Sequence, residues 1–593
     1  MSLHFKRIDT VFVAAVLTIC FSVCPWTTHA AENFAPNPGV PWPATDGLGR
    51  PLPLSEDVGL PKPDRFVGIF YFLWNGQHGD PNSGPFDVAK IMAAHPDALQ
   101  MPTSPPWGPE GAMHFWSEPL FGYYKNADPW VLRRHAHLLA DAGVDTLIFD
   151  TTNRATYRDV YMELCKVFME IRQAGGKTPQ ITFMTNTNAR ETADELYADL
   201  YGAGKYSELW FRWEGKPFLI CDPAQASDTV KEFFTLRRAH WPFEMMNTEK
   251  AWHWEATYPQ PYGFADDPAK AEQVNVSVAQ NLRAADGKVT DMSRGDARVR
   301  SFHDGAVDQS PDAVLHGYNF QEQWTRAWEL DPPFVMVTGW NEWIAGRFKR
   351  EGLPVAFVDQ FDQEGSRDIE MMKGGHGDNY YYQLVAGIRR YKGVPALPQP
   401  AEAHPIDVAG ALSQWEDVAG FEDHSDETIA RDHQGVGTTH YVNETGRNNF
   451  QRLKVAHDSD TVYFYAACTA PLAAASEPNA MNLFINTDGD VSTGWAGYDI
   501  LINAQGIHRS APEPEEKSGG WGWEKVGDLA ARTVLDNTLH LAVPREALGI
   551  PSGAFHIDFK WADNLQEPGD VMDLYLSGDV APEGRYNYRY SGK

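Results

Sequence analysis

The amino-acid sequence predicts an α/β protein: a (β/α)₈ TIM barrel followed by a C-terminal antiparallel β-sandwich. Three observations carry this prediction. Short apolar runs alternate with helical stretches across residues 65–395, no GxGxxG loop follows the first run, and the hydrophobic period becomes two within residues 406–593. Residues 31–64 are Pro-rich with little periodicity, and they are expected to form an extended N-terminal segment.

The apolar runs of the first region are the predicted barrel strands. They cover residues 67–72, 113–115, 145–150, 180–184, 217–221, 243–246, 274–278 and 334–337. Most are apolar on both faces, which is typical of buried parallel strands. About eight strand–helix units fit, the number in a (β/α)₈ barrel. An open doubly wound sheet is the alternative, disfavoured because the first strand leads into Trp74-Asn75 rather than a glycine-rich loop.

One helix has clear start and stop signals. Asp128 precedes Pro129 as an N-cap, and Gly143 follows the last turn. Leu132, Leu138 and Leu139 recur at helical spacing and should form the buried face.

The C-terminal strands show strict alternation. Phe555, Ile557, Phe559 and Trp561 alternate with polar residues, which indicates half-buried antiparallel strands. Residues 393–405 contain four prolines and predict a linker. On this interpretation, the barrel should keep its activity without the sandwich.

The N-terminus predicts export. Lys6 and Arg7 precede an apolar stretch, and small residues follow up to Ala30, so residues 1–30 resemble a signal peptide cleaved near Ala30. The apolar run is too short for a membrane anchor, which needs about 20 residues. The protein is therefore expected to be secreted or periplasmic.

The net charge disfavours some classes of partner, and the cysteine spacing disfavours disulfides and zinc sites. The formal net charge of −30 disfavours nucleic acid and membrane surfaces. Cys165, Cys221 and Cys468 have neither disulfide nor zinc spacing and should be buried free thiols. No metal site is predicted in the barrel, and the oligomeric state cannot be inferred.

The end of the last barrel strand carries the main catalytic candidate. Active sites of such barrels lie at the carboxyl ends of the strands, where Trp340-Asn341-Glu342-Trp343 follows residues 334–337. Indoles around Glu342 should raise its pKa, as a general acid for glycosidic cleavage requires. The alternative is a structural ion pair with Arg347 or Arg350.

A second carboxylate is needed for this chemistry. Asp150 ends a predicted strand and is the preferred partner, while Glu118, Glu249 and Glu255 are alternatives in nearby loops.

Aromatic and polar residues in the predicted loops are typical of sugar-binding sites, because sugar rings present apolar faces. Thirteen of the 20 Trp fall between Trp74 and Trp343. Arg367 lies in a long polar loop expected to cover the barrel mouth, where it could bind an anionic sugar or pair with Asp368 or Glu370. The predicted substrate-binding residues are Trp74, His114, Trp116, Asn153, Glu249, Trp252, His253, Trp340, Asn341, Trp343 and Arg367.

The segment from Val337 to Gly346 resembles the WNEWxxG segment of barrels related to glycoside hydrolase family 99, which includes endo-α-mannosidases and WbsX-like proteins. The resemblance implies a carbohydrate-active (β/α)₈ barrel and a role for Glu342. The family's second catalytic glutamate would fall at Ala345, so the family's carboxylate pair is not present.

Residues 486–499 of the C-terminal region resemble family 9 carbohydrate-binding modules and DOMON-like sandwiches. Asp488 and Asp490 have a spacing compatible with Ca²⁺, but the full EF-hand pattern is absent and an Asx-rich turn is the favoured interpretation. No other cofactor is expected.

Together these features predict an exported glycoside hydrolase acting on a polysaccharide or oligosaccharide. A non-catalytic glycan-binding protein, which the alanine at position 345 favours, is the alternative from another class. A polysaccharide lyase or glycosyl transferase on the same barrel is a further one.

Overall fold

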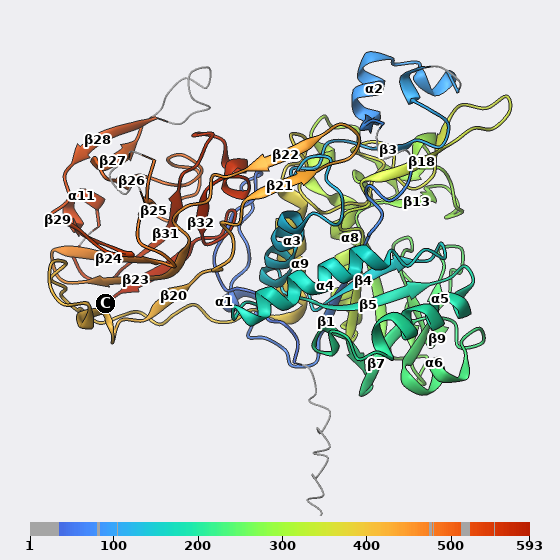
Figure 1. Ribbon diagram of the computed structural model, residues 1–593, viewed down its shortest axis with the longest axis horizontal. Coiled ribbons are helices and arrows are strands. Elements are labelled where there is room, and N and C mark those ends of the chain that lie inside the picture. Colours follow the sequence, from blue (N-terminus) through green and yellow to red (C-terminus); the bar gives the residue numbers. More distant parts are fainter. Residues whose placement is uncertain are drawn as a thin grey trace, which may run out of the picture. The chain divides into compact units, whose positions relative to one another are not determined.

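A nearly closed, mostly parallel sheet is the centre of the first region (Figure 1). The computed structural model describes residues 35–79, 83–102, 105–473, 477, 479–511, 522–550 and 552–593; the predicted signal peptide lies outside them. Ten strands follow one path in the order β10-β8-β7-β5-β4-β1-β17-β12-β11-β9. They are β1 (Phe66–Tyr71), β4 (Thr146–Thr151), β5 (Gln180–Thr185), β7 (Lys216–Ile220), β8 (Thr235–His240), β9 (Thr248–Glu249), β10 (Ala251–His253), β11 (Gly263–Phe264), β12 (Gln273–Ser277) and β17 (Phe334–Thr338). The predicted α/β barrel is thus confirmed in outline.

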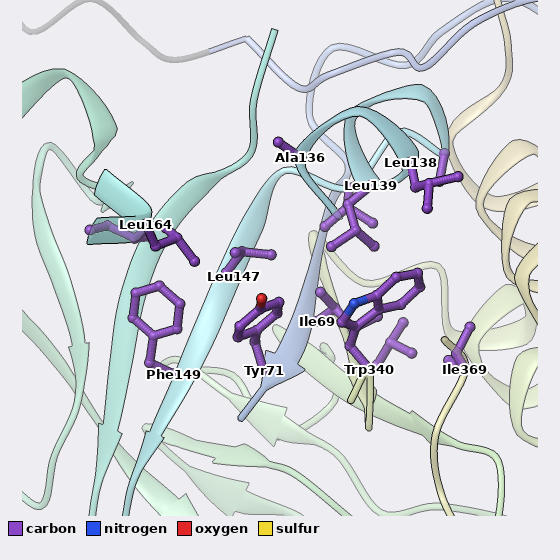
Figure 2. Close-up of a cluster of buried hydrophobic side chains, with 14 of the residues drawn as sticks. Ile69, Tyr71, Ala136, Leu138, Leu139, Leu147, Phe149, Leu164, Trp340 and Ile369 are labelled. Atoms are coloured by element: carbon purple, nitrogen blue, oxygen red, sulfur yellow. The ribbon is translucent and has the colours of Figure 1, made fainter. Parts of the chain in front are cut away.

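Helices pack against this sheet. They are α3 (Pro129–Asp141), α4 (Arg158–Gln173), α5 (Ala189–Leu196), α6 (Asp228–Phe233), α8 (Tyr318–Leu330) and α9 (Asn379–Lys392). The predicted cap of α3 is confirmed, because the Asp128 side chain accepts a hydrogen bond from the Trp130 amide. Figure 2 shows Leu138 and Leu139 of α3 in the same buried cluster as Ile69 of β1. No helix of the described residues is both long and apolar enough to cross a membrane.

Two predicted barrel strands were wrong. Residues 113–115 do form a strand, β3 (Met113–Phe115), but it belongs to a separate sheet with β2 (Phe86–Asp87), β18 (Ile344–Phe348) and β19 (Ala356–Phe357). Residues 243–246 lie in an exposed turn, and the strand is β8, a few residues earlier. The polar pair Arg237-Arg238 hid β8 from a search for apolar runs. Arg237 is buried because Glu272 accepts its hydrogen bonds at 2.6 and 2.8 Å.

A side chain bridges the sheet between β10 and β12. The Gln273 side chain accepts a hydrogen bond from the His253 amide and donates one to the His253 carbonyl, both at 2.7 Å. Gln273 is fully buried. The side-chain amide of Gln273 therefore takes the place of backbone hydrogen bonds between β10 and β12. It joins these two strands where the sheet has no backbone pairing between them.

We expect Gln273→Leu to lower the free energy of unfolding by about 2–6 kcal/mol, since it leaves the His253 amide and carbonyl without a partner and each such buried group costs about 1–3 kcal/mol. Urea denaturation should show a lower midpoint at an unchanged m-value. Gln399→Leu, on the exposed linker, is the control and should change little. A Gln273→Leu protein as stable as wild type would mean that the strands close without this bridge.

The C-terminal region contains two antiparallel sheets. The first has β20 (Gly420–Glu422), β23 (Phe450–His457), β24 (Thr461–Cys468), β29 (Ala531–Leu535) and β30 (Thr538–Pro544). The second has β25 (Asn482–Asn486), β26 (Ile500–Asn503), β27 (Gly506–Ser510), β28 (Trp523–Gly527), β31 (Phe555–Asp563), β32 (Asp579–Ala581) and β33 (Tyr588–Gly592). Phe464, Leu541 and Phe559 belong to one apolar cluster drawn from both sheets. This arrangement is compatible with the predicted sandwich.

Shorter elements complete the described chain. They are α1 (Ser55–Val58), α2 (Val88–Ala94), β6 (Arg212–Trp213), β13 (Gln280–Arg283), β14 (Ala297–Arg298), β15 (Phe302–His303), β16 (Ala306–Val307), α7 (Ala313–His316), β21 (Arg431–Gln434), β22 (His440–Asn443) and α11 (Arg545–Leu548). The three cysteines outside the predicted signal peptide are free and buried, as expected.

Candidate active site

The segment after β17 is anchored to β1. Gly339 begins it at φ 97°, where an added Cβ would lie 2.4 Å from the Arg367 carbonyl oxygen, so only glycine fits. The Trp340 amide then donates to the Phe70 carbonyl. Asn341 accepts from the Phe72 amide and donates to its carbonyl, at 2.9 and 3.1 Å. These bonds fix where Glu342 lies relative to the carboxyl ends of the strands.

Glu342 is held by two side chains of the loop that follows β19. Its Oε2 accepts hydrogen bonds from Gln360 at 2.6 Å and from Arg367 at 2.8 Å. Only 4% of the side chain is exposed. Burial raises the pKa of the Glu342 carboxyl well above its usual range; Asp359 and Asp368 act in the same direction, and Arg367 opposes them. The predicted rise in pKa is thus present, with burial as its main cause.

Arg367 connects several acids at this site. It donates to Glu255 at 2.7 Å and to Glu342 at 2.8 Å, and it lies 3.7 Å from Asp359. Burial opposes its charge, but these three carboxylates outweigh burial and raise its pKa. One guanidinium cannot neutralise three carboxylates, and the pKa of Glu255, Glu342 and Asp359 is raised in each case, mainly by burial.

Asp150 lies near enough to this group to interact electrostatically with Arg367 and Asp359. It is the penultimate residue of β4, is buried, and accepts a hydrogen bond from the Thr152 amide at 2.9 Å. Burial raises its pKa against the Thr152 hydrogen bonds; Asp359 adds to the rise and Arg367 opposes it. The pKa of Asp150 therefore depends on the charges of Asp359 and Arg367, which also act on Glu342.

Asp359, Gln360 and Trp254 lie at the site but were not among the residues predicted for it from the sequence. The Asp359 side chain is 39% exposed, the most accessible of the carboxylates around Arg367. Trp254, partly exposed, has its ring centroid 5.2 Å from the Arg367 guanidinium. Asp359 is the first residue of the polar loop expected to cover the barrel mouth, and Trp254 directly follows Trp252 and His253. Their positions in the sequence were the only features that could have indicated a role at the site.

Several predicted substrate-binding residues are packed inside the protein. The Trp116 and Trp343 rings stack at 4.6 Å, and their indole N–H groups donate to Asp368 and Glu370. Trp340 is fully buried; Figure 2 shows it beside Ile69 and Ile369 in the cluster that includes α3. Trp340 and Trp343, which flank Asn341-Glu342 in the sequence, are thus part of the buried core and not of an accessible sugar-binding surface.

The other predicted substrate-binding residues differ in how far their side chains are exposed to solvent. Trp252 packs on Phe218 inside the barrel, and His253 stacks on His240 at 3.5 Å. His114 is buried and hydrogen-bonded to the Trp107 carbonyl. By contrast, Trp74 is partly exposed and Asn153 is exposed.

Of the three glutamates considered as alternatives to Asp150, only one lies at the site. Glu249 lies 3.9 Å from Lys250 with 61% of its side chain exposed, and Glu118 pairs with Lys90 and Lys373. Glu255 is the alternative that joins Glu342 on Arg367.

The two ion pairs considered from the sequence are not formed. Arg350 pairs with Asp291, and Arg347 donates to the Pro102 carbonyl, so Glu342 pairs with Arg367 instead. Arg367 itself binds Glu255 and Glu342 rather than Asp368 or Glu370.

Comparison with known proteins gives distant structural similarity only. No family model and no curated protein matches the chain. Two structures of a family 99 endo-α-mannosidase from Bacteroides thetaiotaomicron match at 13% and 12% identity, with TM-scores of 0.30 and 0.32, covering 55% of this chain and 97% of theirs. A protein from Bacteroides uniformis described as a candidate carbohydrate-binding protein matches at 10% identity and a TM-score of 0.17, over 33% of this chain and 88% of its own. Similarity at this level assigns neither a family nor an activity.

Proposed function

We propose that the protein is a glycoside hydrolase in which Glu342 is the general acid. The observation that supports this most is a buried glutamate of raised pKa at the carboxyl ends of barrel strands. Its pairing with Arg367 would by itself keep Glu342 ionised. The neighbouring Glu255 and Asp359 share the same guanidinium, however, so they can neutralise Arg367 while Glu342 holds the proton.

The second carboxylate of the mechanism is Asp150 in this proposal. It interacts electrostatically with Arg367 and Asp359, and it lies on β4, whereas Glu342 follows β17. It would activate water or stabilise the positive charge that develops on the sugar. Trp254, partly exposed beside Arg367, offers a ring face on which a sugar can stack.

Glycan binding without cleavage is the second candidate, and a specific feature favours it. Ala345 occupies the position where the resemblance would place a second catalytic glutamate, and it is buried in β18, opposite His114 of β3. If Asp150 does not supply the missing carboxylate, the site retains only a glycan-contacting role.

Incubation with a panel of polysaccharides and oligosaccharides tests the proposal. We expect new reducing ends without unsaturated products, and Asp150→Asn should abolish them. Unsaturated ends would indicate a lyase, transfer to an acceptor glycan without net hydrolysis would indicate a transferase, and binding with no products would indicate a lectin. Each of these three results contradicts the hydrolase assignment.

A further inference from the structure

Three carboxylates meet in the C-terminal region, apart from the candidate active site. Asp423 and Glu427 follow β20, and Asp579 begins β32. One oxygen from each lies within 4.8 Å of the oxygens of the other two. A Ca²⁺ ion binds oxygens at about 2.3–2.6 Å, so oxygens separated by up to about 5 Å can share one ion.

The oxygens available to an ion accept no hydrogen bond, although Glu427 Oε1 lies 3.3 Å from His137 and 3.8 Å from Arg134. Glu427 is 4% exposed and Asp579 is 1% exposed. Both Glu427 oxygens, Asp423 Oδ2 and Asp579 Oδ1 are buried without a hydrogen bond. The opposite oxygens are fixed: Asp579 Oδ2 accepts from the Phe450 amide at 2.6 Å, and Asp423 Oδ1 accepts from Tyr588 at 3.2 Å. Buried carboxylate oxygens without partners are costly unless something compensates them.

Carboxylates outnumber cationic side chains around these three acids. Glu583 adds a fourth carboxylate, while Arg134 lies 3.2 Å from Glu583 and 3.8 Å from Glu427. The Lys560 ammonium donates to the Pro582 carbonyl. Four carboxylates therefore face Arg134, Lys560 and the imidazole of His137, which lies 3.3 Å from Glu427. The carboxylates outnumber the side chains that can be cationic, and a bound cation would reduce the difference.

A route for the ion is also present. A cavity of about 350 Å³ is lined by Asp423 and Glu583, among others. It gives water and ions access to the edge of the cluster, and water can complete the six to eight ligands that Ca²⁺ takes.

We propose that Asp423, Glu427 and Asp579 form a structural Ca²⁺ site that ties β32 to the segment after β20. Ligands that are all oxygen select hard ions such as Ca²⁺ over zinc. A neighbouring set, His137, His424 and Glu427, also has ligand spacing. Its imidazoles already lie against acids, however: His137 is 3.1 Å from Asp426 and 3.3 Å from Glu427, and His424 is 3.1 Å from Asp141.

The test uses the whole protein after treatment with EDTA and removal of the chelator. Added Ca²⁺ should raise the melting temperature by several degrees, because the ion binds the folded state alone. Tb³⁺ should bind with sensitised luminescence, since Tyr588 contacts Asp423, and Ca²⁺ should displace it.

Asp579→Asn is the key variant. Its amide oxygen can still accept from the Phe450 amide while the NH₂ group faces the ion position, so the fold should survive and the Ca²⁺ and Tb³⁺ responses should disappear. The double variant Asp488→Asn/Asp490→Asn alters the exposed turn instead and should keep both responses. Three results would overturn the proposal: no response in the wild-type protein, a response lost only in the double variant, or a Zn²⁺-specific response that depends on His424.

Discussion

Replacing Glu342 by glutamine is expected to lower kcat on a natural glycan by about 10²–10⁴-fold, the usual contribution of general acid catalysis. The amide can keep the contacts with Arg367 and Gln360 but cannot deliver a proton. Much of the loss should be recovered on an activated aryl glycoside, whose leaving group departs without protonation. KM should change little, because the variant side chain has nearly the same volume.

The pH profile separates catalysis from structure at this position. Burial raises the pKa of Glu342, and a general acid must be protonated to act, so wild-type kcat/KM should fall as pH rises through that pKa. The Glu342→Gln variant should lack this alkaline limb. Glu255→Gln is the matched comparison: it removes a carboxylate that shares Arg367 with Glu342, so it should move the limb to lower pH and retain most of kcat at pH values below the limb. If a folded Glu342→Gln variant has normal turnover, Glu342 is a structural partner of Arg367.

The strands predicted from the sequence agree best with the structure where hydrophobic burial alone determines that a segment forms a strand. Runs such as residues 67–72 and 334–337 are apolar on both faces, and only a buried strand satisfies them. β8 escaped prediction because its burial depends on Glu272, a distant residue that neutralises Arg237. Local patterns contain no information about such long-range pairs.

The site shows the same division. The carboxyl end of β17 could be located from the sequence, and so could Glu342 on it. The orientation of each neighbour could not, because consecutive residues after a strand point in different directions. Trp340 joins the buried cluster around Ile69, whereas Trp254, far away in the sequence, contacts Arg367. Only the folded chain shows which indole is accessible.

The buried surface between the barrel and the C-terminal strands bears on how the chain folds. Tyr575 and Tyr586 belong to the same apolar cluster as α3 and α9, and residues 35–593 form one compact unit. Asp378, almost fully buried, accepts hydrogen bonds from Tyr575 and Arg585. Asp128, the cap of α3, also pairs with Arg431 at 2.8 Å. These contacts argue against independent folding of the barrel, although its composition and linker suggested it.

A chain ending at Lys392 is therefore expected to lose its native fold, and with it the proposed activity. Truncation exposes the apolar faces of α3 and α9 and removes every C-terminal partner of Asp128 and Asp378. Near-UV circular dichroism and limited proteolysis should report loose packing. Asp378→Ala tests one contact within the full chain: it should cost about 3 kcal/mol, the lower range for breaking a buried pair, whereas Glu402→Ala, in an exposed pair, should cost almost nothing. A folded, active fragment ending at Lys392 would instead show that the C-terminal strands are an accessory domain.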